Sequence, residues 1–242
     1  MLVFLQNTIA VEYSLKAGLH VICEKPISVT AETGQQMVDL ALAANKVTAI
    51  NLPLLYSESV DQIAIWLQQK YLGEIRKIIL KFRYPQWPRK WQDVEWLKTK
   101  EQGGPIREIV THFIYLVYYL FGEMEIQSSR NSRAQPDGYE HSLSSVFTVG
   151  AIPGLIDLET DVNEPEENSL ILVGKEKSTR FSSWHRLEVL NKGKYEIFME
   201  DSSNSSLQLV AEFVKQLNRK NGNLTSFEVA TWVQGVIDIL VS

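Results

Sequence analysis

The feature that most constrains this chain is a short apolar run, Val21–Cys23, followed directly by Glu24, Lys25 and Pro26. An apolar run of this length that ends at a proline is typical of a buried strand. In open α/β sheets, ligands bind beyond the carboxyl ends of the strands, which is where Lys25 would lie. We therefore expect a sheet whose edge presents a lysine to a ligand.

Residues 1–51 alternate strand-like and helix-like patterns. We expect strands at about 2–5, 20–23 and 47–50, and helices at about 7–17 and 30–45, the second capped by Thr30. This β-α-β-α-β order is typical of a parallel sheet. The pattern changes near Asn51–Pro53, where we place the domain boundary.

Residues 52–242 follow a different pattern, in which short strands succeed one another without intervening helices. We expect helices at about 57–69 and 106–121 and strands at about 75–83, 125–130, 142–149, 154–160 and 169–174. Two final helices, at about 207–217 and 225–240, would pack back on the first domain. The pattern predicts an α/β fold with an open, mostly antiparallel or mixed sheet.

Composition excludes several classes of partner. The net charge of −5 and the pI near 5.5 argue against nucleic acid and against an anionic membrane surface, since both favour a basic protein face. No apolar run approaches the ~20 residues of a spanning helix. Cys23 is the single cysteine and cannot form an internal disulfide. We therefore predict a cytoplasmic protein with a small-molecule ligand.

A second chemical motif begins at Gly103 and Gly104, with Pro105 suited to the first position of a helix. Glu108 and His112 then lie four residues apart on one helical face, where a carboxylate can orient an imidazole for proton transfer. The structural alternative is a surface pair worth a few tenths of a kcal/mol. We predict no metal site, because the sequence offers no third ligand at a recognisable spacing.

Three tryptophans, Trp87, Trp91 and Trp96, precede this helix. They could stack on a sugar ring, or they could pack a long loop onto the sheet, and packing is the favoured interpretation. Tyr115 and Tyr119 continue the helical face of Glu108 and would add aromatic rings with polar tips.

In this order the motifs resemble the glucose-fructose oxidoreductase and inositol dehydrogenase family, Gfo/Idh/MocA. The similarity runs from Asn7 through Glu24-Lys25-Pro26 and the Gly-Gly helix to Thr225-Ser226-Phe227-Glu228. It implies that residues 1–51 are the C-terminal part of a Rossmann dinucleotide-binding domain. It also implies that residues 52–242 are a substrate-binding and oligomerisation α/β domain, which would form a homo-oligomer through its sheet.

The resemblance implies an oxidoreductase that transfers hydride between NAD or NADP and a hydroxyl or carbonyl group of a sugar, cyclitol or related molecule. Asn7, Glu24, Lys25 and Pro26 would then contact the cofactor. Lys25 would also touch the substrate and polarise its oxygen, which agrees with the chemistry of an ammonium group at a strand end.

Three residues of the Gly-Gly helix complete the site that the resemblance implies. Glu108 and His112 would bind the substrate hydroxyl and exchange its proton, and Tyr115 would line the substrate pocket. The catalytic set is therefore Lys25, Glu108 and His112.

The chain departs from the family pattern at its start, since it contains no Gly-x-Gly-x-x-Gly turn. The resemblance implies that about two βαβ units, on the order of 60 residues, are absent before Leu2. Two alternatives therefore stay open: a non-catalytic family member that serves as a binding or scaffold protein, and an enzyme similar to biliverdin reductase. Tyr115, Tyr119 and the apolar Leu52–Leu55 stretch resemble the second of these, but biliverdin reductase does not keep an intact Glu-Lys-Pro. A sugar or cyclitol substrate is therefore the preferred interpretation.

Overall fold

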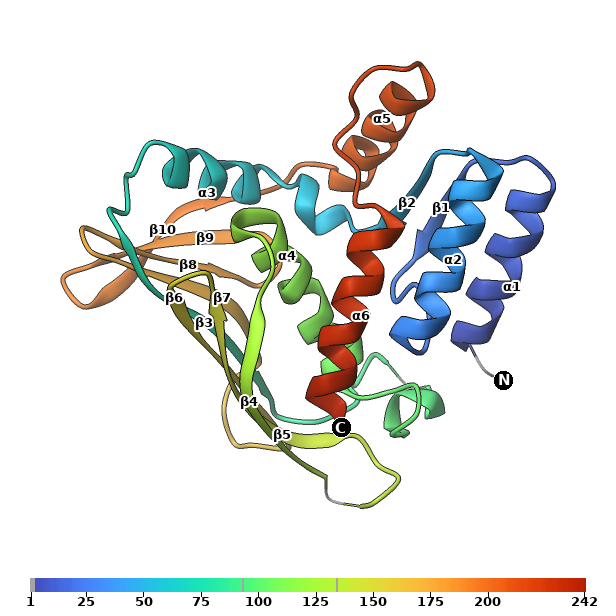
Figure 1. Cartoon of the computed structure of the whole chain (residues 1–242). Coiled ribbons are helices and arrows are strands. Elements are labelled where there is room, and N and C mark those ends of the chain that lie inside the picture. Colours follow the sequence, from blue (N-terminus) through green and yellow to red (C-terminus); the bar gives the residue numbers. More distant parts are fainter. Residues whose placement is uncertain (1–2, 93, 134) are drawn as a thin grey trace. The chain divides into compact units, whose positions relative to one another are not determined.

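The computed structural model describes residues 3–92, 94–133 and 135–242, with side chains described from residue 8 onward in the first helix. It divides into two compact units (Figure 1). The first comprises Met1–Tyr56 with Asn204–Ile239, and the second comprises Ser57–Ser203 with Leu240–Ser242. The domain boundary that the sequence suggests near residue 51 stays a prediction, because this division into units does not test it.

The first unit is a small α/β structure around two parallel strands, β1 and β2. Its described elements are α1 (Val3–Lys16), β1 (Val21–Glu24), α2 (Ala31–Ala44), β2 (Thr48–Asn51), a 3₁₀ turn (Pro53–Tyr56), α5 (Ser205–Leu217) and α6 (Phe227–Val241). Thr30 caps α2 by accepting a hydrogen bond from the backbone N–H of Thr33, as its sequence predicts.

One prediction for this unit is wrong. The strand expected at residues 2–5 is helical from Val3 onward, because Val3–Leu5 form the first turn of α1. The short apolar run fits either structure by periodicity alone. It continues into the helical period of the residues that follow it, and that local continuity selects the helix.

The second unit is built on an eight-stranded mixed sheet in the order β10-β9-β8-β7-β3-β6-β5-β4. Its strands are β3 (Ile75–Tyr84), β4 (Glu125–Arg133), β5 (Glu140–Val149), β6 (Ile152–Thr160), β7 (Glu167–Gly174), β8 (Ser178–Ser182), β9 (Arg186–Asn191) and β10 (Lys194–Glu200). Strands β3 and β6 pair in parallel, whereas the other neighbours are antiparallel. The fold is therefore α/β, with the parallel start and the mixed sheet that the sequence predicts.

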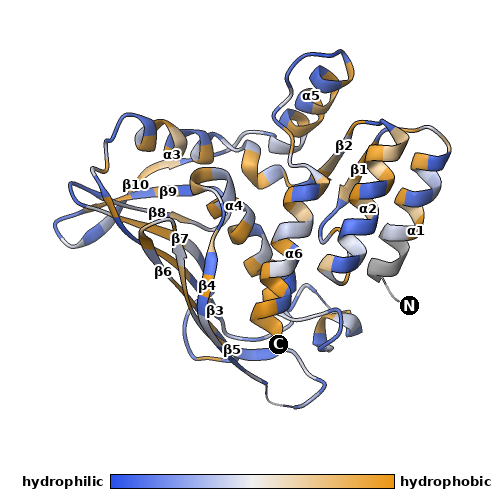
Figure 2. Ribbon diagram, viewed as in Figure 1, coloured by the Kyte–Doolittle hydropathy of each residue, from blue (hydrophilic) through white to orange (hydrophobic). Residues whose placement is uncertain are grey.

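Helices α3 (Glu58–Gln68) and α4 (Thr111–Phe121) cover one face of this sheet (Figure 1). Phe113 of α4 packs edge-on against Phe82 of β3, with ring centroids 5.0 Å apart, and Trp66 of α3 packs against Phe198 of β10 at 4.7 Å. Most of α4 is hydrophobic (Figure 2). Burial of its apolar side chains anchors this helix, since removing one buried Phe side chain costs about 3–5 kcal/mol.

Strands β8–β10 extend the sheet beyond the last strand that the sequence analysis identified. Their register is antiparallel, and Phe181 of β8 and Leu187 of β9 lie opposite each other and are fully buried. Among the described residues, no helix is both long enough and apolar enough to cross a membrane.

Candidate functional site

The carboxyl ends of β1 and β2 bring two polar side chains together. Glu24 and Asn51 are partners in the strand register, and Asn51 Nδ2 donates a 2.7 Å hydrogen bond to Glu24 Oε1. Both are the last residues of their strands. This is the edge of a parallel sheet at which ligands bind in open α/β folds.

Lys25 and Pro26 form the turn that leaves this edge. Lys25 is half-buried, Pro26 is buried, and Ile27 is fully buried beneath them. The Lys25–Pro26 peptide bond is cis. Burial on the far side of the turn holds the backbone in place and leaves the lysine at the edge of the sheet.

Helix α6 holds the segment that follows this turn, at the start of α2. Asp238 Oδ2 accepts a 3.0 Å hydrogen bond from the backbone N–H of Ala31 at the start of α2. Gln234 Nε2 donates to the carbonyl oxygen of Val29 at 3.1 Å and to Asp238 Oδ1 at 2.8 Å. The carboxylate satisfies an amide at a helix N-terminus, where negative charge is favoured. Asn7 lies within α1, and its side chain is outside the described part of the structure.

The Gly103-Gly104 turn lies against other backbone so closely that it admits no side chain. A Cβ atom on Gly103 would lie 2.3 Å from the carbonyl oxygen of Trp96. Gly104 has a φ of +89°, and a Cβ there would lie 2.2 Å from Oε2 of Glu140. Glycine is therefore required by close approach at the first position, and by both approach and conformation at the second.

A buried ion pair lies beside this turn. Glu140 is fully buried, and Arg133 Nη2 donates a 2.7 Å hydrogen bond to its Oε1. The same Arg133 nitrogen donates to the carbonyl oxygen of Val241 at 2.8 Å. Burial raises the pKa of Glu140, and the charge of Arg133 opposes that rise. Glu140 and Arg133 thus fix the turn from which the next helix starts.

The helix that carries the candidate residues begins with a π-helical turn, Ile106–Val110, before α4 starts at Thr111. The backbone N–H of Thr111 reaches the carbonyl oxygen of Ile106. The helix that the sequence predicts at 106–121 is confirmed in its bounds, but its first turn is π-helical. Glu108 and His112 are therefore not related by a regular α-helical turn. Such π turns are frequent at functional sites.

Glu108 is held by a polar relay from the preceding loop. Gln92 Nε2 donates to Glu108 Oε1 at 3.2 Å, and Arg89 Nε donates to Gln92 Oε1 at 2.7 Å. Glu108 is half-buried, whereas its neighbours Ile109 and Val110 are buried. The carboxylate is therefore oriented by a side chain that sequence reasoning did not identify.

His112 lies against an aromatic ring from the β8–β9 turn. Its ring centroid is 5.3 Å from that of Trp184, with an interplanar angle of 84°. Trp184 also contacts Phe113 at 5.7 Å, which fixes the indole between α4 and the sheet. Sequence reasoning missed Trp184, because this contact joins segments about 70 residues apart and no local pattern signals it.

The other aromatic candidates occupy different environments. Tyr115 is 2% exposed, and Trp87 is 3% exposed with Nε1 donating to the carbonyl oxygen of Leu97 at 3.3 Å. Trp91 is 72% exposed. Trp87 therefore packs inside the protein and holds the loop, whereas most of the Trp91 side chain is exposed to solvent.

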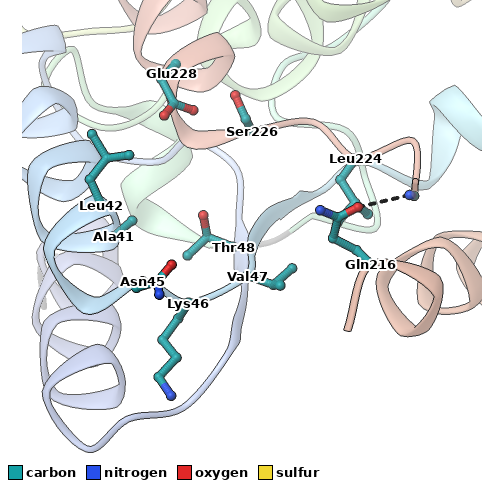
Figure 3. A pocket seen from close by; sticks show the side chains of 11 residues that line it. Ala41, Leu42, Asn45, Lys46, Val47, Thr48, Gln216, Leu224, Ser226 and Glu228 are labelled. Carbon is teal, nitrogen blue, oxygen red and sulfur yellow. Dashed lines mark hydrogen bonds between the residues drawn. The ribbon is translucent and has the colours of Figure 1, made fainter. Parts of the chain in front are cut away.

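A cavity of about 430 Å³ lies in the first unit (Figure 3). Its walls include Lys46, Thr48, Gln216 and Glu228. Thr48 begins β2, so the cavity is at the opposite end of this strand from Asn51. None of the candidate residues lines it.

The candidate site residues are divided between the two units. Lys25 belongs to the first unit, and Glu108 and His112 belong to the second. Their convergence on one ligand stays a prediction. Among the described residues, no group of three or more His, Cys, Asp or Glu side chains is placed to hold a metal ion.

Two family models match the chain. Residues 60–180 match the GFO/IDH/MocA C-terminal domain, and residues 6–52 match an oxidoreductase family with an NAD-binding Rossmann fold. The D-glucoside 3-dehydrogenase of Escherichia coli K12 is 28% identical over 133 residues, which are 53% of this chain and 36% of that protein. The chain thus spans little more than a third of the length of the curated relatives it matches.

Solved structures of similar fold cover almost the whole chain. A levoglucosan dehydrogenase in complex with NADH superposes with a TM-score of 0.81 at 16% identity, covering 97% of this chain and 74% of that one. An inositol dehydrogenase homologue from Azotobacter vinelandii, complexed with NAD⁺, gives 0.78 at 17% identity, covering 98% and 72%. At these identities the likeness shows the fold.

Proposed function

Because the chain belongs to the GFO/IDH/MocA family of oxidoreductases, we propose that it serves hydride transfer between NAD or NADP and a hydroxyl or carbonyl group of a sugar or cyclitol. The observation that carries the proposal is the pair of half-buried polar residues, Glu108 and His112, in a segment whose other members from Ile109 to Val117 are buried. Relatives named for D-glucoside, levoglucosan and inositol support the substrate class.

The residues at the carboxyl ends of β1 and β2 suit a nicotinamide dinucleotide. Lys25 offers a cation, and Asn51 and Glu24 offer an amide and a carboxylate at the same strand ends. The cofactor, when bound, supplies or accepts the hydride. We propose that Glu24, Lys25, Pro26 and Asn7 contact it, with the choice between NAD and NADP left open by these residues.

The chemistry of the chain's own residues is proton transfer and charge stabilisation. The Lys25 ammonium group would stabilise negative charge on the substrate oxygen. The His112 imidazole would take or return the hydroxyl proton, with Glu108 binding the hydroxyl beside it. Tyr115 and Trp184 would shape the apolar wall, and the contact of Trp184 with His112 restricts the ring's orientation.

The test is turnover with levoglucosan and myo-inositol as trial substrates, measured by the absorbance of NADH or NADPH. His112→Ala should lower kcat at least 100-fold, since general acid–base catalysis contributes about 10²–10⁴-fold. His185→Ala, at an exposed histidine, is the matched control and should retain activity. Equal turnover in the wild-type chain and in His112→Ala would contradict the proposed role.

We also propose a homo-oligomer formed through the sheet face opposite α3 and α4. Ile79 and Ile171 are cross-strand neighbours on that face and are only partly buried. Ion pairs flank them, including Lys81–Glu167 at 2.8 Å and Arg180–Glu188 at 2.7 Å. Sedimentation should show a dimer or larger species that Ile171→Glu dissociates, and a monomer at every wild-type concentration would contradict this proposal.

A cytoplasmic location is proposed from the cysteine usage. Cys23 is free and 4% exposed, and burial raises its pKa to about 12. A single buried thiol is typical of a reducing compartment. Fractionation of cells that express the chain tests this location.

A further inference from the structure

A second cavity, of about 240 Å³, lies in the second unit beside the loop that precedes the Gly-Gly turn. Three cationic side chains, Arg89, Lys90 and Lys98, line it together with Gln86, Pro88 and Gln92. No acidic side chain belongs to this lining among the residues that the structure describes. The cavity therefore concentrates positive charge in a chain whose net charge is −5.

Arg89 provides a preformed binding group in this cavity. Its side chain is 9% exposed, and its Nε is committed to Gln92 Oε1. Glu166 Oε1 lies 3.6 Å from Nη1, which is beyond hydrogen-bond distance. Within the described part of the chain, the terminal guanidinium nitrogens thus have no hydrogen-bond acceptor. A planar pair of such donors matches the oxygens of a phosphate or carboxylate group.

The guanidinium group is also held in position by aromatic rings. It lies 4.5 Å from the ring centroid of Trp91 and 6.0 Å from that of Trp87. Cation–π contacts of this kind immobilise Arg89 without using its N–H donors. The result is an ordered cation whose hydrogen-bonding groups stay available to a ligand.

The cavity adjoins the candidate substrate site through one shared residue. Gln92 lines the cavity, and its Nε2 donates to Oε1 of Glu108 at 3.2 Å. Only the Gln92 side chain separates Glu108 from the cavity. A ligand whose hydroxyl group binds Glu108 could therefore place a neighbouring substituent in the cationic cavity.

Among the residues that the structure describes, two acidic side chains near the cavity are largely exposed. Glu95 pairs with Lys98 at 2.7 Å, but its side chain is 86% exposed. Glu166 is 44% exposed and only approaches Arg89. The Glu95–Lys98 pair is exposed on both sides, and exposed ion pairs of this kind are weak, typically below about 1 kcal/mol.

We propose that Arg89, Lys90 and Lys98 bind an anionic substituent of the substrate, a phosphate or carboxylate group carried on the sugar or cyclitol. This inference rests on the proposed function for the identity of the ring, but the anion pocket stands on its own contacts. Trp91, which is 72% exposed and lies beside Arg89, would pack against the ligand next to the anionic group.

Calorimetric titration of the whole chain tests the pocket. The probes are inorganic pyrophosphate, D-glucose 6-phosphate, D-glucuronate and neutral methyl α-D-glucopyranoside, each titrated with and without saturating NADH. We expect pyrophosphate and at least one charged sugar to bind at least 10-fold more tightly than the neutral glycoside. Stronger binding of the phosphate than of the glucuronate would identify phosphate as the natural group, and the reverse order would identify carboxylate.

The test variant carries Lys90→Gln and Lys98→Gln together. Both lysines are exposed, so the double substitution should not destabilise the fold. It should weaken binding of the anionic probes at least 10-fold and leave the neutral glycoside unchanged. Lys100→Gln, at an exposed lysine outside the cavity, is the matched control and should stay within twofold of wild type. Arg89→Lys should weaken the same probes, because a lysine cannot form the bidentate contact.

The results separate this inference from the proposed function. Tight pyrophosphate binding that depends on Lys90 and Lys98, without any sugar binding or turnover, would support the anion pocket and contradict the sugar oxidoreductase. Turnover of neutral sugars with anion affinities unchanged in the double variant would support the oxidoreductase and overturn the pocket.

Discussion

The two halves of the candidate site are built by different means. The Glu24–Pro26 turn follows from a short strand, a proline and the start of the next helix, with Asp238 and Gln234 of α6 holding the segment after it. The Gly103–His112 segment depends on a buried carboxylate and on a π turn, both remote from any local pattern. Local sequence is therefore enough to predict the candidate binding turn, whereas tertiary packing determines the position of the helix that carries Glu108 and His112.

Gly104→Ala is expected to have the largest effect, because it tests whether the Gly103–His112 segment depends on tertiary contacts. The substitution imposes a φ of +89° on alanine and drives its Cβ to 2.2 Å from Glu140 Oε2. We expect the free energy of unfolding to fall by about 4 kcal/mol, from backbone strain and displacement of a buried ion pair together. Urea denaturation measures the change.

Gly122→Ala is its control. Gly122 has a φ of +91°, but nothing lies within 4 Å of a Cβ there. It should therefore cost about 2 kcal/mol, from backbone strain alone. Equal losses in the two variants would mean that contact with Glu140 does not hold the turn.

Arg133→Met tests the buried ion pair and should cost about 3 kcal/mol at neutral pH, because it removes the hydrogen-bonded cation and leaves the buried Glu140 charge with only the field of Arg107. Burial already raises the pKa of Glu140 above its ordinary 4.5. The folded state thus retains this proton longer than the unfolded state, so the contribution of Glu140 to stability is greatest below pH 4.5 and is lost as pH rises.

The fall in stability with rising pH should be steeper in Arg133→Met, since removing the cation raises the pKa of Glu140 further. Thermal melts between pH 4 and pH 8 report the trend. Adding Glu140→Gln to Arg133→Met should flatten the pH dependence of stability. A pH profile for Arg133→Met parallel to that of the wild type would contradict the role given to Glu140.

Asp238→Ala addresses the other half of the site. It removes the acceptor of the Ala31 amide and of Gln234, so we expect a loss of about 1 kcal/mol. Hydrogen exchange of the Ala31 amide should accelerate. Asp39→Ala, at an exposed carboxylate paired with Gln35, is the matched control. Unchanged exchange at Ala31 would show that α6 does not hold the start of α2.

The smallest effect concerns Cys23, whose burial raises its pKa to about 12. At pH 8 the folded thiol should react with iodoacetamide far more slowly than the unfolded chain does, since the thiolate is the nucleophile. The reaction should accelerate as pH rises toward 12. Labelling at equal rates in native and urea-unfolded protein would contradict the burial of β1.

Much of the fold could be predicted because its signals are local. The cap at Thr30, the strand before Glu24 and the alternation in β3 all lie within about ten residues of sequence. The error at Val3–Leu5 has the same cause, since a short apolar run does not distinguish strand from helix. Strands β8–β10 escaped prediction because their burial is set by neighbours across the sheet.

The candidate site divides in the same way. Glu24, Lys25, Glu108 and His112 could be named from their motifs, and the structure places Glu24 with Asn51 at one sheet edge. Three further residues could not be named from the sequence. Gln92 contacts Glu108 across the loop, and Arg89 reaches Glu108 only through Gln92. Trp184 contacts His112 from a strand turn far along the chain. The π turn was hidden as well, since its residues have an ordinary helical composition.

We propose that this chain contributes a nicotinamide cofactor site at the carboxyl ends of β1 and β2. Calorimetric titration of the 242-residue chain with NADH and NADPH tests it most directly. We expect saturable one-to-one binding of at least one cofactor. Lys25→Ala should weaken this binding at least 10-fold, and Lys46→Ala, at the opposite end of the strand, should leave it unchanged. A folded chain that binds neither cofactor, or binds one equally well without Lys25, would contradict the proposal.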